Sequence, residues 1–67
     1  MEKTEVAEWM SKFYGQPIEP NEVIHLPKSQ KVLEIECMNS DVYRTRKNDT
    51  VLMAYVYADG SIYIKAI

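Results

Sequence analysis

The fold of this chain is decided by residues 51–67, which read VLMAYVYADGSIYIKAI. Two runs rich in β-branched and aromatic side chains flank Asp59-Gly60, and this arrangement predicts a β-hairpin. An Asp-Gly pair tolerates positive φ at both central positions of a type I′ turn, whose twist matches that of the strands. With this two-residue turn, Tyr57 would lie opposite Ile62.

Side chains alternate between the two faces of a strand, so the turn also assigns each hairpin residue to a face. We expect one face to be the core face, and it holds Val51, Met53, Tyr55, Tyr57, Ile62, Ile64 and Ala66. The opposite, outer face then holds Leu52, Ala54, Val56, Ala58, Ser61, Tyr63, Lys65 and Ile67.

The length of 67 residues predicts a single domain over residues 1–67. The only cysteine, Cys37, excludes a disulfide within the chain and favours a cytoplasmic location. We expect no signal peptide and no membrane span, because no apolar run has the required length or flanks. The net charge is −2, and residues 1–27 carry five acidic against two basic side chains, which argues against phosphate binding by that half.

A helix is predicted over residues 5–14. Thr4 suits the N-cap, and Gly15 followed by Pro17 suits the C-terminal end. Apolar side chains recur at helical spacing, and we expect this stripe to pack on the core face of the sheet. The stripe consists of Val6, Trp9, Met10 and Phe13.

A connector follows over residues 16–31, and its prolines keep it extended or turning. It contains the apolar segment from Glu22 to Leu26. This segment predicts either an edge strand, where the neighbouring proline is tolerated, or one turn of helix started by Pro20. It would either cover the rim of the core or be presented to a partner.

Residues 32–67 predict the sheet. Strands are expected at 32–38 and 42–47, joined by a three-residue turn at 39–41, because that register places Glu36 opposite Arg44. The alternative register would bury arginines, which costs far more than the roughly 0.2–1 kcal/mol of a cross-strand ion pair.

A second three-residue turn, at residues 47–49, would pair Thr45 with Val51 and put Tyr43 on the core face. The predicted fold is α+β, with one N-terminal helix packed on a four-stranded antiparallel β-meander. The outer face would expose an apolar patch that includes Leu52 and Val56. Such a patch usually marks a partner surface or a homodimer interface, unless the connector folds back over it.

The chain predicts no enzyme, metal site or cofactor site. His25 is the only histidine, no nucleophile has an evident base, and the two glycines are isolated. Single-stranded nucleic acid is a weaker alternative, because basic and aromatic side chains could share a sheet face. These are Arg44, Arg46 and Lys47 with Tyr43, and Lys65 with Tyr63. The predicted acidic partners and the negative net charge argue against it.

Short motifs at both ends of the chain resemble the uracil-DNA glycosylase inhibitors that phages encode. Glu22-Val23-Ile24 followed by Leu26-Pro27 is similar to the family's Glu-Ser-Ile motif with its following Leu-Pro. Residues 60–67 resemble the family's glycine turn and Ile-Lys-x-aliphatic ending, and Ala54-Tyr55-Val56 also has a counterpart. The resemblance implies a DNA mimic that blocks the enzyme's DNA-binding groove in the host cytoplasm.

The resemblance also implies roles for single residues. Glu22 would approach the enzyme's groove as a backbone phosphate does, and Ile24 would match the motif isoleucine. Leu26 and Val56 would form the wall of a hydrophobic cavity that captures an apolar side chain of the enzyme. Val23 replaces the motif serine and would be a partner-binding position with the other four residues. Residues 28–31 are basic where the family has an acidic second helix.

Overall fold

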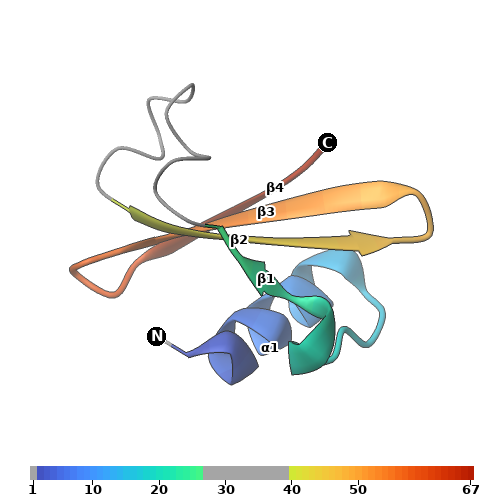
Figure 1. The fold of residues 1–67 in the computed structure, drawn as a ribbon, viewed down its shortest axis with the longest axis horizontal. Helices are drawn as coiled ribbons and strands as arrows, with labels where there is room; N and C mark the ends of the chain where they lie inside the picture. Colours follow the sequence, from blue (N-terminus) through green and yellow to red (C-terminus); the bar gives the residue numbers. More distant parts are fainter. Residues whose placement is uncertain (1, 27–39) are drawn as a thin grey trace.

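The computed structural model describes residues 2–26 and 40–67. The strands form one antiparallel sheet in the order β1-β2-β3-β4, and α1 lies on one side of it (Figure 1). The predicted α+β class, one helix on a four-stranded antiparallel sheet, is confirmed. The elements are α1 (Lys3–Tyr14), the 3₁₀ turn η1 (Pro20–Glu22), β1 (Ile24–His25), β2 (Ser40–Lys47), β3 (Thr50–Tyr57) and β4 (Ile62–Ala66).

Helix α1 begins two residues before the predicted start, with Glu2 rather than Thr4 at the N-cap. It ends at Tyr14 as predicted. Gly15 has φ 81°, and its N–H donates to the Ser11 carbonyl at 2.8 Å. The left-handed conformation favours glycine and ends the helix there.

Both alternatives for the connector are realised, one after the other. A single helical turn begins at Pro20, and the edge strand β1 follows it. Ile24 lies opposite Arg44 and takes the position that we assigned to Glu36. The strand predicted over residues 32–38 lies outside the described residues.

The two hairpin turns have the opposite lengths to those predicted. Asn48 and Asp49 have φ values of 50° and 67° and form a two-residue turn of type I′ between β2 and β3. The turn between β3 and β4 has three residues, 58–60, between the bonded residues Tyr57 and Ser61, and Gly60 closes it at φ 92°. Gly60 N–H donates to the Tyr57 carbonyl at 3.0 Å, and Tyr57 N–H donates to the Ser61 carbonyl at 2.9 Å. These bonds are typical of a type I turn with a G1 bulge.

The two turn lengths shift β3 by one residue against both of its neighbours. Thr45 lies opposite Leu52, and Ala54 lies opposite Ile64. The two errors cancel between β2 and β4, so Tyr43, Thr45, Ile62 and Ile64 face the helix as predicted. The predicted faces of β3 are wrong: Leu52, Ala54 and Val56 point toward α1, and Val51, Met53, Tyr55 and Tyr57 point away from it.

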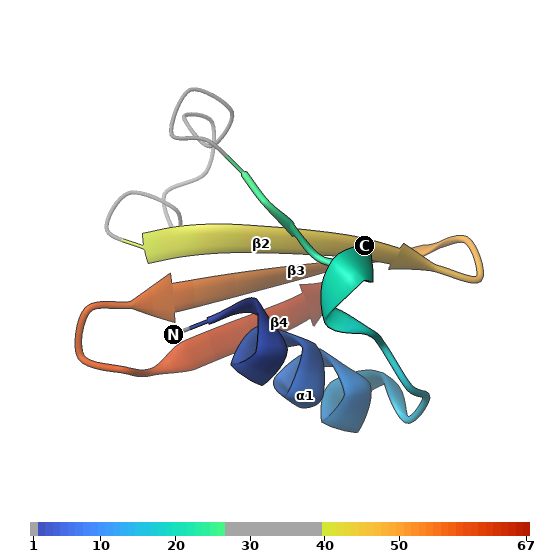
Figure 2. The same ribbon diagram turned by 60° about the horizontal axis from the view of Figure 1, so that its bottom comes forward.

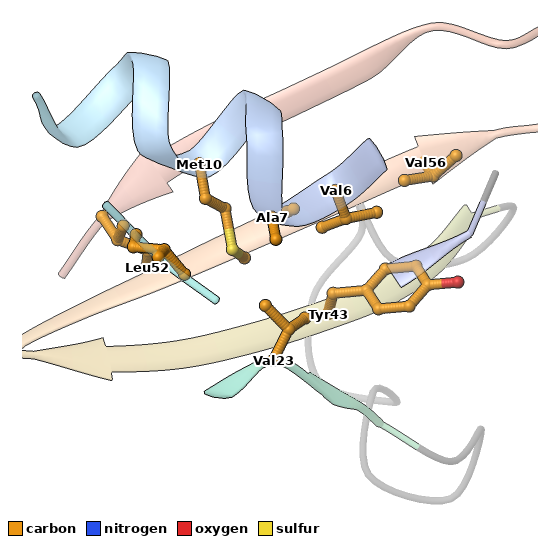
Figure 3. Close-up of a cluster of buried hydrophobic side chains, with 9 residues drawn as sticks. Val6, Ala7, Met10, Val23, Tyr43, Leu52 and Val56 are labelled. Carbon is orange, nitrogen blue, oxygen red and sulfur yellow. The ribbon is translucent and has the colours of Figure 1, made fainter. Parts of the chain in front are cut away.

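The main core lies between α1 and the sheet (Figure 3). Ala7 lies against the sheet, where its small side chain lets the helix approach closely. Trp9 and Phe13, which we expected in this core, are 45% and 53% exposed. The buried members are Val6, Ala7, Met10, Ile18, Val23, Tyr43, Leu52, Ala54 and Val56.

Side chains of α1 also fasten the connector and the β2–β3 turn. Ser11 Oγ accepts the N–H of Ile18 at 2.9 Å and donates to the Ala7 carbonyl at 2.7 Å. The Tyr14 hydroxyl donates to the Lys47 carbonyl at 3.2 Å. The Ser11 bonds hold the connector at Ile18, just before η1, against α1, and the Tyr14 bond holds the end of α1 at the end of β2.

The far face, which we define as the side of the sheet away from α1, carries a second buried cluster. It consists of Leu26, Val42 and Tyr55, with Met53 and Tyr57 packed against it. The ring of Tyr55 stacks on Tyr63 at 5.9 Å, and Lys65 Nζ lies 5.7 Å from the Tyr55 ring. The predicted exposed patch containing Leu52 and Val56 does not exist, because those side chains are under the helix.

Candidate functional site

Glu22, the acidic residue of the suspected motif, closes η1 through a reciprocal cap. Pro20 has a fixed φ that suits the first position of the turn. The Glu22 N–H donates to the Glu19 carbonyl at 2.9 Å, and the Glu22 carboxylate accepts the Glu19 N–H at 3.2 Å. This local geometry fixes the direction of the carboxylate before any partner arrives.

The ammonium group of Lys47, at the end of the neighbouring strand β2, contacts the same carboxylate. Lys47 Nζ lies 3.2 Å from Glu22 Oε2 and 3.4 Å from Oε1, and each side chain is about one-third exposed. The Glu19 N–H, and next the Lys47 ammonium, hold the pKa of the Glu22 carboxyl below its ordinary value. Glu22 is therefore ionised at neutral pH, and its charge is partly balanced within the protein.

Val23 and Thr45 anchor the start of β1 to β2. Val23 is buried in the main core, so it does not present a side chain to a partner as the motif comparison implied. Thr45 Oγ1 donates to the Glu22 carbonyl at 2.9 Å, and the Thr45 side chain is buried. The motif is thus held rigidly at its backbone.

Ile24 and His25 are the exposed side chains of β1. Ile24 is 50% exposed and points to the far face beside Arg44. His25 stacks on Tyr43 with ring centroids 4.5 Å apart, and its Nε2 lies 3.5 Å from Asp41 Oδ1. Burial, and next the Asp41 carboxylate, raises the pKa of the Tyr43 hydroxyl.

Leu26 and Val56 do not form one cavity wall. Leu26 belongs to the cluster on the far face, and Val56 belongs to the core beneath α1. The sheet separates them, and both are buried. The cavity inferred for this pair from the resemblance is therefore wrong.

A hollow of about 420 Å³ lies at the outer edge of the sheet and brings two of the predicted residues together. Glu22 and Ile24 share it with residues that the motif did not indicate. Arg46 Nη2 lies 3.6 Å from Asp49 Oδ1, and both of these side chains are highly exposed. The hollow combines one carboxylate with two guanidinium groups and is lined by Glu22, Ile24, Arg44, Thr45, Arg46 and Val51.

The motif did not place the arginines beside Glu22, because the predicted register paired them with acids of the strand expected over residues 32–38. We assigned them instead to a face for single-stranded nucleic acid. Their alternation with Thr45 did indicate a common face, but the neighbour of β2 was misidentified. In the part of the chain that the structure describes, no group of three His, Cys, Asp or Glu side chains is placed to hold a metal. None of the helical segments described is both long and apolar enough to cross a bilayer.

The geometry defines a small α+β protein whose outermost strand carries a rigid, partly charged and partly apolar hollow. Comparisons of the chain with protein-family models, with curated proteins and with solved structures give no match.

Proposed function

We propose that this protein binds and blocks a bacterial DNA-processing enzyme, most specifically uracil-DNA glycosylase, by inserting the β1 edge into the enzyme's DNA-binding groove. The observation that carries the proposal is the joint presence of Glu22 and the exposed Ile24 in one hollow on the outer strand. A groove that binds DNA must accept phosphates, and an ionised carboxylate beside an apolar side chain offers both charge and contact area.

The Glu22 carboxylate and the start of β1 are already fixed in position in the free protein, which supports the proposal. The Glu19 N–H orients the Glu22 carboxylate, and the buried Val23 holds the strand that follows. Less flexibility is therefore lost on binding than for a free loop. Lys47 would have to share Glu22 with a basic group of the enzyme.

In this proposal the protein is not an enzyme, needs no cofactor and acts in the cytoplasm where the enzyme works. Val23, Leu26 and Val56 then contribute through packing, and Glu22 and Ile24 make the contacts. This division of roles narrows the partner-binding set that the motif alone suggested.

The direct test measures uracil excision from a DNA substrate by purified uracil-DNA glycosylase with increasing amounts of this protein. We expect inhibition that saturates near equal molar amounts. Ile24→Asp should weaken it strongly, and Glu22→Gln should weaken it less, because Lys47 already offsets part of that charge. Glu8→Gln, an exposed acid on α1, is the matched control and should inhibit normally. Full excision at a large excess of the wild-type protein would refute the proposal.

A second candidate, single-stranded nucleic acid binding, is favoured by the charge of the far face. Arg44, Arg46 and Lys65 lie on it with the half-exposed Tyr63, and none of its residues in the described strands is Asp or Glu. Stacking on an aromatic ring beside basic groups suits single strands.

This candidate predicts oligonucleotide binding that weakens steeply as salt increases. Arg44→Gln should reduce the affinity and the salt slope, whereas Lys12→Gln on the helix side should change neither. Titration of a labelled oligonucleotide at low salt decides the matter, and absence of binding there would eliminate this candidate.

A further inference from the structure

The edge of the sheet opposite β1 is the open edge of β4. Ile67 and Val51 exchange both of their backbone hydrogen bonds, and Tyr57 N–H bonds the Ser61 carbonyl. In an antiparallel ladder, bonded pairs alternate with non-bonded pairs. The N–H and C=O groups of Ile62, Ile64 and Ala66 therefore point away from β3, toward the side of β4 where residues 2–26 and 40–67 place no further strand.

An apolar hollow of about 360 Å³ runs beside this edge, between β4 and α1. Trp9 and Phe13 stand one helical turn apart on one side of it, and Ile62 and Ile64 lie on the other. Lys12 Nζ lies 4.9 Å from the centre of the Trp9 ring, at the rim. Two large aromatic side chains that are about half exposed beside a free strand edge mark a surface that association would cover.

We propose that the occupant is a second copy of this chain, with β4 pairing antiparallel to β4 of that copy across a two-fold axis at Ile64. In this register Ile64 lies opposite Ile64, and Ile62 lies opposite Ala66 of the second copy. All outward N–H and C=O groups of β4 then find partners, and one continuous sheet runs through both copies.

Pairing of the two β4 strands in the registers on either side of this one would be less favourable. Moving the axis to Lys65 places the two lysines directly opposite each other, which is unfavourable. Moving it to Tyr63 leaves the backbone groups of Ala66 without partners. The axis at Ile64 instead sets Lys65 opposite the Tyr63 ring of the second copy, where an ammonium group and an aromatic ring attract each other.

The charges of α1 fit the same symmetry. Helix α1 runs in the same direction as β4 (Figure 2), so the two-fold axis makes the two helices antiparallel. Glu5 lies one helical turn before Trp9 on α1, and Lys12 lines the hollow. Glu5 of each copy is thereby directed toward Lys12 of the other. A surface that complements itself in backbone, apolar and charged groups is what a two-fold interface requires.

The first test follows amide hydrogen exchange by NMR at a series of protein concentrations. The amides of Ile62, Ile64 and Ala66 should exchange fast in dilute samples and become protected as the concentration rises. The amides of Tyr63 and Lys65, which bond β3, are internal controls whose protection should not depend on concentration. Exchange of the Ile62, Ile64 and Ala66 amides that stays fast at every concentration would overturn the proposal.

The second test uses charge reversal with sedimentation equilibrium. Lys12→Glu brings acids together and should raise the dimer dissociation constant about tenfold. The double variant Glu5→Lys/Lys12→Glu restores opposite charges and should recover most of the affinity. Both positions are exposed, so circular dichroism should show the same fold throughout. Equal dissociation constants for all three proteins, or a wild-type protein that stays monomeric, would contradict the proposal.

This interface uses the sheet edge opposite β1 and leaves β1 free in both copies. Lys12→Glu should therefore not alter inhibition of uracil-DNA glycosylase, and Ile24→Asp should not alter dimerisation. The two proposals can fail separately.

Discussion

Glu22 is the residue at which local and tertiary contacts meet. Its carboxylate caps the turn that positions it and also bonds Lys47 from β2. Its backbone carbonyl accepts the buried Thr45 hydroxyl. The side chain is thus fixed on one side by its own turn and on the other by the sheet. Each of these contacts can be tested by a separate substitution.

The titration of Glu22 depends on two groups of unequal effect. The lowered pKa means that the carboxylate stabilises the fold above its ordinary pKa, and this contribution is lost as the pH falls through the folded pKa. Lys47→Met should raise the pKa only partway, because the larger cause, the Glu19 N–H, remains. Carboxyl ¹³C shifts measured against pH check this, and a Glu22 that titrates normally in the wild-type protein would contradict it.

Thr45→Val tests the bond that ties η1 to β2. Valine has a similar shape, but the Glu22 carbonyl loses its donor in a site where Thr45 is almost fully buried. We expect the free energy of unfolding to fall by about 1–3 kcal/mol, measured by urea denaturation. Thr50→Val, a less buried threonine of β3, is the control and should change stability little.

At the scale of elements, the turns determine which face of β3 is buried. Asn48 and Asp49 both adopt positive φ, whereas Asp59 does not and Gly60 does. The Asp59 carboxylate instead accepts the N–H of Ser61 at 2.9 Å and its hydroxyl at 2.6 Å. One Asp lies in a left-handed position and the other acts as a side-chain acceptor.

The same substitution should therefore have opposite effects in the two turns. Asp49→Gly removes the strain of a left-handed aspartate and should stabilise the protein by about 0.5–1 kcal/mol. Asp59→Gly removes the bonds to Ser61 and should destabilise it. Thermal unfolding of both variants measures the signs, and two shifts in the same direction would contradict these turn assignments.

At the scale of the whole molecule, α1 covers one face of the sheet and η1 with β1 closes its side (Figure 1). The middle of β3 has buried side chains on both faces. Leu52, Ala54 and Val56 are buried toward α1, and Tyr55 is buried on the far face. Because the buried side chains of α1 pack against the helix-side residues of β3, the stability of the protein should depend on those residues.

Leu52→Ala should lower the free energy of unfolding by about 2–5 kcal/mol, because it leaves a cavity under α1. Val56→Arg should prevent folding, since it buries a charge without a partner in the core. Tyr63→Ala, at a half-exposed position on the far face, is the matched control and should be tolerated better. A folded and stable Val56→Arg variant would show that Val56 is not beneath the helix.

The sequence by itself determined the fold class, the end of α1 at Gly15, the meander of β2, β3 and β4, and the core-facing residues of β2 and β4. These follow from local chemistry, because alternation and glycine positions depend on the residue and its near neighbours. For the site, the motif located Glu22 and Ile24 but not the arginines beside them.

Only the tertiary structure decided the face of β3, the identity of the strand beside β2 and the rotation of α1. β3 is apolar on both faces, so alternation within it has no phase that the sequence could show. Ala7 lies against the sheet in place of Trp9 and Phe13 because close packing of the helix favours a small side chain. The side of α1 that faces the sheet depends on how the helix and the sheet fit together, so the sequence of neither element determines it alone.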